Sequence, residues 1–264
     1  MSPNVTLYIA LGFYAAGTLV ALISLFTREV RTQHAGLVLM IVGWLSHTFW
    51  IGTICARTGH PPLTNLPEAA SFIAWTVFLA EMILFFRYRV DAAAFFVYPL
   101  VLMLLTVSAV VREPFAQMDP ALRSGLFTAH VLLSTVGVAA LLVGLAFTLL
   151  AFMQDRSLKS KQRGPLWEWI PSLNVCRTLS YRTLAIGFSI YTLGILAGIL
   201  WSYRTTAELI DLRTKQIGAI VAWVLFAMLL QLFIKGAYRA RRTMVISACA
   251  FVATLIAILG IHHV

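Results

Sequence analysis

The sequence has few charged residues and few cysteines for its length. Only 11% of its 264 residues are charged, whereas 60% are apolar. A soluble globular domain carries about 25% charged residues, so this composition excludes a protein whose main solvent is water. The three cysteines, Cys55, Cys176 and Cys249, form no CxxC pair, which argues against a disulfide framework and against a thiol-redox motif.

The apolar residues are gathered in long uninterrupted runs. Because lipid offers the backbone no hydrogen bonds, runs of roughly 20 apolar residues favour spanning helices over barrel strands, which would alternate over about 10 residues. We predict an all-α, polytopic membrane bundle of about eight transmembrane helices. It is expected to form one domain over residues 1–264, with its longest connection near 154–182. The expected spans are 5–26, 35–56, 69–86, 92–111, 125–153, 183–203, 217–234 and 243–263.

The net charge of +10 is unevenly divided between alternate loops. One set of loops holds 14 lysines and arginines, and the other set holds six. Because cytoplasmic loops are enriched in these residues, the first set is expected to face the cytoplasm. Both termini then lie on the non-cytoplasmic side of a multi-pass protein in the cell's inner membrane. The basic residues indicate topology, and no nucleic-acid partner is expected.

Histidines gather toward the predicted outer side of the membrane. On this topology four of the six lie in the outer halves or at the outer ends of spans: His47, His130, His262 and His263. Ionisable side chains inside a membrane are costly, and their default interpretation is functional. The same residues can also serve simply by hydrogen-bonding headgroups or a neighbouring helix.

His130 lies near the start of the predicted helix 125–153. Ser134, Gly137 and Gly144 follow on the same helical face. Such a flat face of small residues permits two interpretations. It allows a close neighbouring helix, or it allows a planar macrocycle to approach with its iron bound by the imidazole.

The predicted helix 183–203 offers a similar choice. Gly194 and Gly198 form a small-xxx-small step that suits close packing, and the helix ends in Trp201 and Tyr203. The two aromatic residues either anchor the helix at the membrane interface or form a stacking edge for a hydrophobic ligand.

The loop before the predicted helix 69–86 carries a signal for a helix start. Asn65 can cap the helix, Pro67 suits its first turn, and Glu68 lies near the positive end of its dipole. We therefore expect this helix to begin directly after Asn65.

Several short motifs together resemble the CcsA/HemX cytochrome c assembly family. They are Pro62-Leu63-Thr64-Asn65-Leu66-Pro67-Glu68, Ala129-His130-Val131, Pro171-Ser172-Leu173, Leu179-Ser180-Tyr181-Arg182, Gly187-Phe188, Thr192-Leu193-Gly194-Ile195, Gly198, Trp201 and Gly260-Ile261-His262. Members of this family handle haem in the membrane. The resemblance implies that His130 and His262 are axial ligands of a b-type haem at the outer face, with its propionates near external arginines. Trp201, Tyr203 and His47 are further candidate cofactor-binding residues.

The sequence departs from that family at two places. Cytochrome-assembling members carry a tryptophan-rich external segment, and residues 201–215 here lack its intervening tryptophans. A histidine expected in the next span is replaced by Gln231, whose amide is a poor iron ligand. The reduced pattern is closer to the HemX-like branch, whose members are linked to haem biosynthesis or supply.

We therefore predict a haem-binding membrane protein of cytochrome c biogenesis or haem homeostasis, with the lipid bilayer, haem and assembly or haem-synthesis proteins as partners. No catalytic residues are predicted. The alternative is a regulatory or structural partner of haem biosynthesis that binds no haem. A transporter would have Glu81 as its intramembrane acid, and a two-haem cytochrome b is disfavoured because the inner half lacks histidine.

Overall fold

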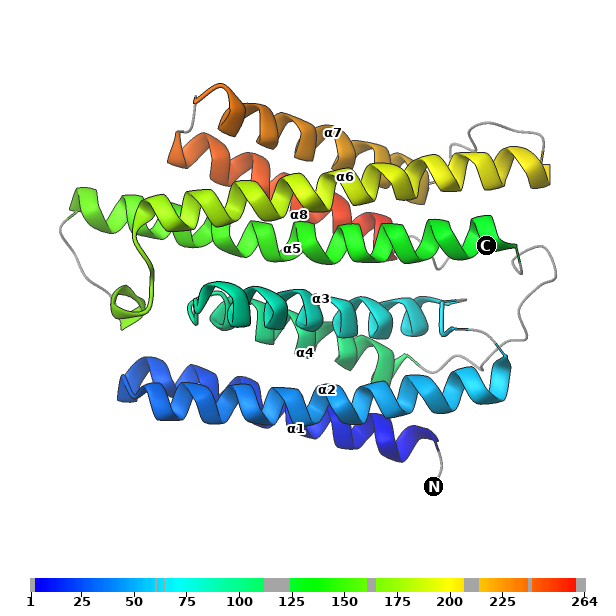
Figure 1. The fold of residues 1–264 in the computed structure, drawn as a ribbon, viewed down its shortest axis with the longest axis horizontal. Coiled ribbons are helices and arrows are strands. Elements are labelled where there is room, and N and C mark those ends of the chain that lie inside the picture. Colours follow the sequence, from blue (N-terminus) through cyan, green and yellow to red (C-terminus); the bar gives the residue numbers. More distant parts are fainter. Residues whose placement is uncertain are drawn as a thin grey trace. The chain divides into compact units, whose positions relative to one another are not determined.

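The computed structural model describes residues 3–59, 61–63, 65–111, 124–160, 165–206, 214–236 and 239–259, which are helical apart from short connections (Figure 1). The elements of these ranges are α1 (Pro3–Thr27), α2 (Val30–Thr58), α3 (Leu66–Tyr88), α4 (Ala94–Val110), α5 (Gly125–Ser160), the 3-10 helix η2 (Pro165–Glu168), α6 (Leu173–Thr206), α7 (Thr214–Ile234) and α8 (Ala240–Leu259). No strand occurs in these ranges, so the all-α prediction is confirmed.

Six of the described helices are long and apolar enough to cross a membrane. They are α1, α2, α3, α5, α6 and α7, whereas α4 is a shorter apolar helix of 17 residues. These helices make the chain a multi-pass membrane protein. The side of the membrane on which the termini lie stays a prediction.

Helices α5 and α6 are longer than predicted. α5 continues to Ser160 and α6 already begins at Leu173, so the expected connection over 154–182 is wrong. Hydropathy marks where a helix meets lipid, but backbone hydrogen bonding continues beyond that boundary. Outside the apolar runs, a carboxylate oxygen of Asp155 in α5 lies 3.9 Å from a guanidinium nitrogen of Arg177 in α6. This ion pair joins the two helix extensions.

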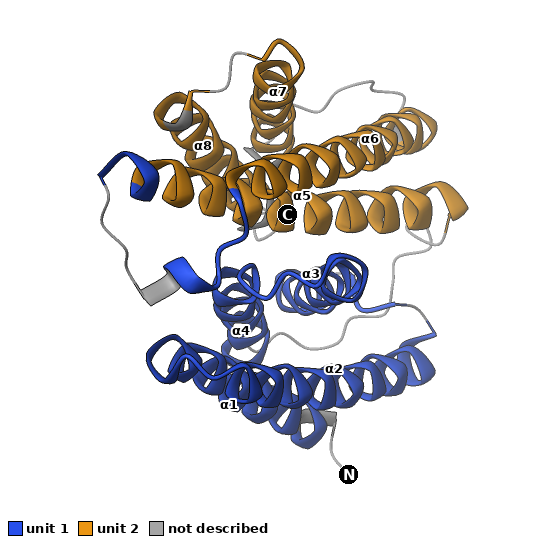
Figure 2. Cartoon of the chain, turned by 60° about the vertical axis from the view of Figure 1, so that its left-hand side comes forward, with its two compact units in different colours: residues 1–117, 157–172 blue, residues 118–156, 173–264 orange. Residues whose placement is uncertain are grey.

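The chain divides into two compact units (Figure 2). Unit 1 comprises residues 1–117 and 157–172, and unit 2 comprises residues 118–156 and 173–264. Unit 1 thus contains α1 to α4 with η2, and unit 2 contains most of α5 together with α6, α7 and α8. The single domain inferred from the sequence stays a prediction.

In unit 1, α1 and α2 pack with their backbones in close approach. A Cβ atom added to Gly17 of α1 would lie 3.0 Å from the carbonyl oxygen of Gly36 of α2. The cap predicted for α3 is present, because the Asn65 side chain accepts a hydrogen bond of 3.0 Å from the backbone N–H of Glu68. Capping fixes the start of this helix as expected.

In unit 2, α5 and α6 pack through glycines contributed by both helices. A Cβ atom at Gly137 or Gly144 of α5 would meet Tyr191 or Leu184 of α6, and one at Gly187 of α6 would meet Leu141 of α5. The small-residue face of α5 therefore serves helix packing, one of the two interpretations left open by the sequence. This packing positions the residues of the candidate site.

Candidate functional site

His130 is the candidate ligand that the structure describes most completely. It lies near the start of α5, and its side chain is half-buried against α6. Its Nδ1 lies 2.8 Å from the backbone carbonyl oxygen of Gly194 and 3.5 Å from Oγ of Ser134. Both partners come from the glycine-lined α5–α6 contact.

The carbonyl of Gly194 determines the tautomer of this imidazole. A carbonyl oxygen can only accept, so Nδ1 must carry the proton that it donates. In the neutral ring the lone pair then resides on Nε2. Metal-binding histidines in proteins usually have this arrangement, with one nitrogen donating to a carbonyl and the other binding the metal. The chemistry of His130 therefore fits an axial ligand of haem iron.

Gly198 makes room for the imidazole ring. A Cβ atom at this position would lie 2.5 Å from Nδ1 and 2.7 Å from Cε1 of His130. Gly194, one turn earlier, likewise lies against Ser134. The two glycines of the small-xxx-small step thus admit the His130 ring and bring its carbonyl acceptor within reach, which the sequence pattern by itself did not indicate.

Two aromatic residues contact each other at the same end of the α5–α6 pair as His130. Phe127, three residues before His130, lies 5.1 Å from Trp201 between ring centroids. Trp201 follows Gly198 by three residues and therefore lies on the same face of α6. Tyr203 is 53% exposed and two residues further on, so it faces away from Trp201. Helical spacing thus places Trp201, but not Tyr203, on the face of α6 that carries Gly198, and both residues stay predictions as cofactor-binding residues.

His262 and His263 lie outside the described residues, as does His60. The described part of α8 ends at Leu259. The pairing of His130 with His262 therefore stays a prediction that depends on the resemblance.

His47 lies in the core of unit 1, and its side chain is fully buried. Its Nε2 is 2.7 Å from Oγ of Ser71, and its Nδ1 is 3.4 Å from the hydroxyl of Tyr14. Both ring nitrogens are thus engaged between α1, α2 and α3. A spacing of three and four residues places Gly43, His47 and Trp50 on one face of α2, so helical periodicity could have indicated this burial.

Replacing His47 with leucine (His47→Leu) is expected to destabilise the protein and to leave haem binding unchanged. The substitution removes the partner of two buried hydroxyl groups, which costs about 1–3 kcal/mol. Thermal unfolding of the detergent-purified protein measures the loss, and His34→Leu at an exposed position is the control. Loss of haem with unchanged stability would instead make His47 a ligand.

Glu81 of α3 is only 2% exposed, and its Oε2 has no hydrogen-bond partner among the residues that the structure describes. Its side chain faces the core of unit 1, and it lies away from lipid and from the membrane interface.

The described residues contain no group of three or more His, Cys, Asp or Glu side chains able to hold a metal ion. A multidentate metal centre is therefore not formed within those ranges. Haem iron needs only one or two protein ligands, because the porphyrin supplies the remaining four.

Known proteins of cytochrome c assembly are similar to this chain. A sequence model of the family described as "Cytochrome C assembly protein" matches residues 63–264. The chain is 25% identical over 228 residues to the "Cytochrome c biogenesis protein CcsA" of Prochlorococcus marinus (strain MIT 9301), covering 78% of this chain and 74% of the relative. It is 26% identical over 281 residues to the protein of that name in Synechococcus sp. (strain CC9605), covering 96% and 92%.

A solved structure shows the same fold. The "Cytochrome c Heme Lyase CcmF" superimposes with a TM-score of 0.76 at 16% identity, over 98% of this chain and 47% of that one. The chain therefore spans about half the length of that protein. At this identity the likeness concerns the fold alone.

Proposed function

Since this chain belongs to the cytochrome c assembly protein family, we propose that it binds haem in the membrane and presents it at the outer face for cytochrome c biogenesis. The iron is held by Nε2 of His130. The relatives named for cytochrome c biogenesis support the process, and the geometry of unit 2 supports the ligand. The cell's inner membrane as the location is part of this proposal.

The observation that carries the proposal is the 2.8 Å hydrogen bond between His130 Nδ1 and the Gly194 carbonyl. It orients the ring and assigns the lone pair to Nε2, as an axial ligand requires.

The surrounding residues have separate tasks in this proposal. Phe127 and Trp201 supply apolar surface for the porphyrin, and His262 supplies the second axial nitrogen, as the resemblance implies. Arg204 is exposed and lies three residues after Trp201, on the same face of α6. Its guanidinium is suited to hold a haem propionate at the membrane surface.

Absorption spectroscopy of the purified full-length protein after haem supply tests the proposal. We expect a Soret band and a b-type pyridine haemochrome for the wild type, and a large loss of bound haem for His130→Ala. The matched control is His34→Ala, which removes an exposed histidine of α2 and should leave the spectrum unchanged.

The outcome that contradicts haem binding is the absence of a Soret band. A band that persists after both His130→Ala and His262→Ala would contradict the ligands alone. In cells, the proposal further expects less covalently haem-bound cytochrome c with His130→Ala, at an equal amount of the membrane protein.

One observation favours a second function, that of a regulatory partner of haem biosynthesis without bound haem. Gln231, where the family has a histidine, leaves α7 without an iron ligand at that position. Deletion of the gene distinguishes the two functions. Normal holocytochrome together with an altered amount of a haem-synthesis enzyme would favour the second. Assignment to the HemX-like branch stays a prediction.

A further inference from the structure

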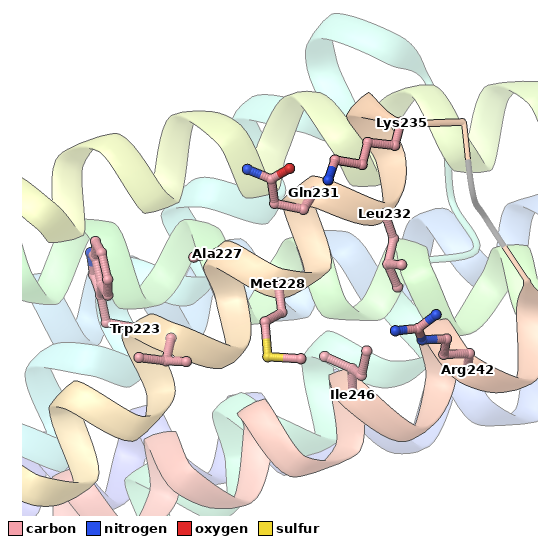
Figure 3. Close-up of a pocket in the computed structure, with 9 residues that line it drawn as sticks. Trp223, Ala227, Met228, Gln231, Leu232, Lys235, Arg242 and Ile246 are labelled. Atoms are coloured by element: carbon pink, nitrogen blue, oxygen red, sulfur yellow. The ribbon is translucent and has the colours of Figure 1, made fainter.

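A groove of about 460 Å³ lies between α7 and α8, away from the His130 site (Figure 3). Its wall is mostly apolar, with Trp223, Met228 and Ile246 among the lining residues. Met228 is 44% exposed, so the groove faces outward from the helix pair. On a membrane protein, an outward-facing apolar groove of this kind is in contact with lipid.

The polar groups of the groove are concentrated at one end. Figure 3 shows Lys235 and Arg242 at this end and Trp223 at the other. Both cationic side chains are exposed, and neither forms an ion pair with an acidic residue in the described part of the chain. The groove therefore presents two positive charges with no negative counterpart from these residues.

Gln231 lies one turn before Lys235 and also lines the groove. Its amide is exposed on a stretch of α7, residues 217–234, that is otherwise apolar, and it has no side-chain partner among the residues that the structure describes. An amide without a partner in contact with hydrocarbon is costly. A ligand with hydrogen-bond acceptors just below its charged group would remove this cost.

We propose that the α7–α8 groove is a binding site for one anionic phospholipid. Lys235 and Arg242 bind the phosphodiester, and the Gln231 amide N–H groups donate to the ester carbonyls one turn deeper. An acyl chain lies along Met228 and Ile246 toward Trp223. The positive-inside rule assigns this end to the cytoplasmic leaflet, whose surface is negatively charged.

The dimensions of the groove suit this ligand. Trp223 and Lys235 are 12 residues apart, about 18 Å along the axis of α7. One leaflet of a bilayer contributes about 15 Å of hydrocarbon, half of the roughly 30 Å core. A single acyl chain can therefore run the length of the groove with its phosphate at the cationic end.

Native mass spectrometry of the full chain in detergent tests the proposal, with phosphatidylglycerol and phosphatidylcholine of identical acyl chains as probes. We expect the wild type to retain one phosphatidylglycerol in preference to phosphatidylcholine. The double substitution Lys235→Gln and Arg242→Gln is expected to weaken that binding about 10- to 30-fold. Ala227→Phe, which fills the groove with apolar volume, should weaken the binding of both lipids.

The matched control is the double substitution Arg239→Gln and Arg241→Gln. It removes the same number of positive charges, two, from positions close to Arg242 at or just before the start of α8, and both positions are exposed and do not line the groove. We expect it to retain phosphatidylglycerol as the wild type does. An equal loss in this control, or equal retention of the two lipids by the wild type, would overturn the proposal.

Haem is the competing occupant, because it too combines an apolar body with two negative charges. The groove is a haem site, and the lipid proposal fails, if added haem displaces the retained lipid and if haem binding is lost in Ala227→Phe but not in His130→Ala. Unchanged lipid retention in the presence of haem supports the proposal.

Discussion

Replacing Gly198 with alanine (Gly198→Ala) is expected to weaken haem binding while α5 and α6 remain packed. The added Cβ atom would lie 2.5 Å from Nδ1 and 2.7 Å from Cε1 of His130, so the imidazole ring must rotate away. Rotation breaks the 2.8 Å hydrogen bond to the Gly194 carbonyl, which orients the ring and fixes its tautomer. Loss of such a supporting bond typically lowers metal affinity by about 10- to 100-fold.

Haem titration followed at the Soret band measures this effect, alongside thermal unfolding of the same samples. The nearest atoms to the added methyl group belong to a side chain, so the helix backbones need not move apart and stability should change little. Gly125→Ala is the matched control, because Gly125 lies five residues before His130 on α5 with open space around it. Wild-type haem affinity in Gly198→Ala would show that the orientation of His130 is unimportant, while His130→Ala still tests the ligand itself.

The sequence is sufficient to predict the helices because lipid, as the solvent, requires each spanning segment to satisfy its own backbone hydrogen bonds. Long apolar runs leave no alternative to helices that satisfy their own backbone, and the cap at Asn65 obeys a local rule that needs no knowledge of tertiary structure. The ends of α5 and α6 could not be predicted in this way. Asp155 lies near the end of α5 and Arg177 near the start of α6, and their polarity marks the limit of the lipid and not the limit of the helix.

The candidate site was predictable only in part, for a similar reason. Sequence spacing indicated that His130 shares a face with Ser134 and Gly137, but it left the choice between packing and cofactor open. The partner that orients the ring is a backbone carbonyl of another helix, at Gly194, and backbone groups carry no signature in a sequence. The predicted depth in the membrane placed His47 in the same group as His130. The face of α2 on which His47 lies, however, directs its side chain into the core of unit 1.

A large loss of stability is expected for Gly137→Ala. The added Cβ atom would lie 2.5 Å from the backbone nitrogen and 2.7 Å from the Cα of Tyr191. These are backbone atoms of α6, so no side-chain rotation can relieve the overlap and the two helices must separate. Overpacking of this kind costs about 1–3 kcal/mol. In lipid the loss is not recovered elsewhere, because close van der Waals contact is a main force that holds such helices together.

Unfolding of the purified protein by heat or by titration with a denaturing detergent measures the loss, with Gly52→Ala as the control. Gly52 lies inside α2 with no atom within 4 Å of an added Cβ, so alanine there should change the stability by less than about 1 kcal/mol. Gly187→Ala provides an independent check from the other helix, because its Cβ would lie 2.8 Å from the backbone nitrogen of Leu141. If Gly137→Ala and Gly187→Ala are as stable as Gly52→Ala, α5 and α6 do not pack through their glycines. The close approach that brings Gly194 beside His130 would then be contradicted as well.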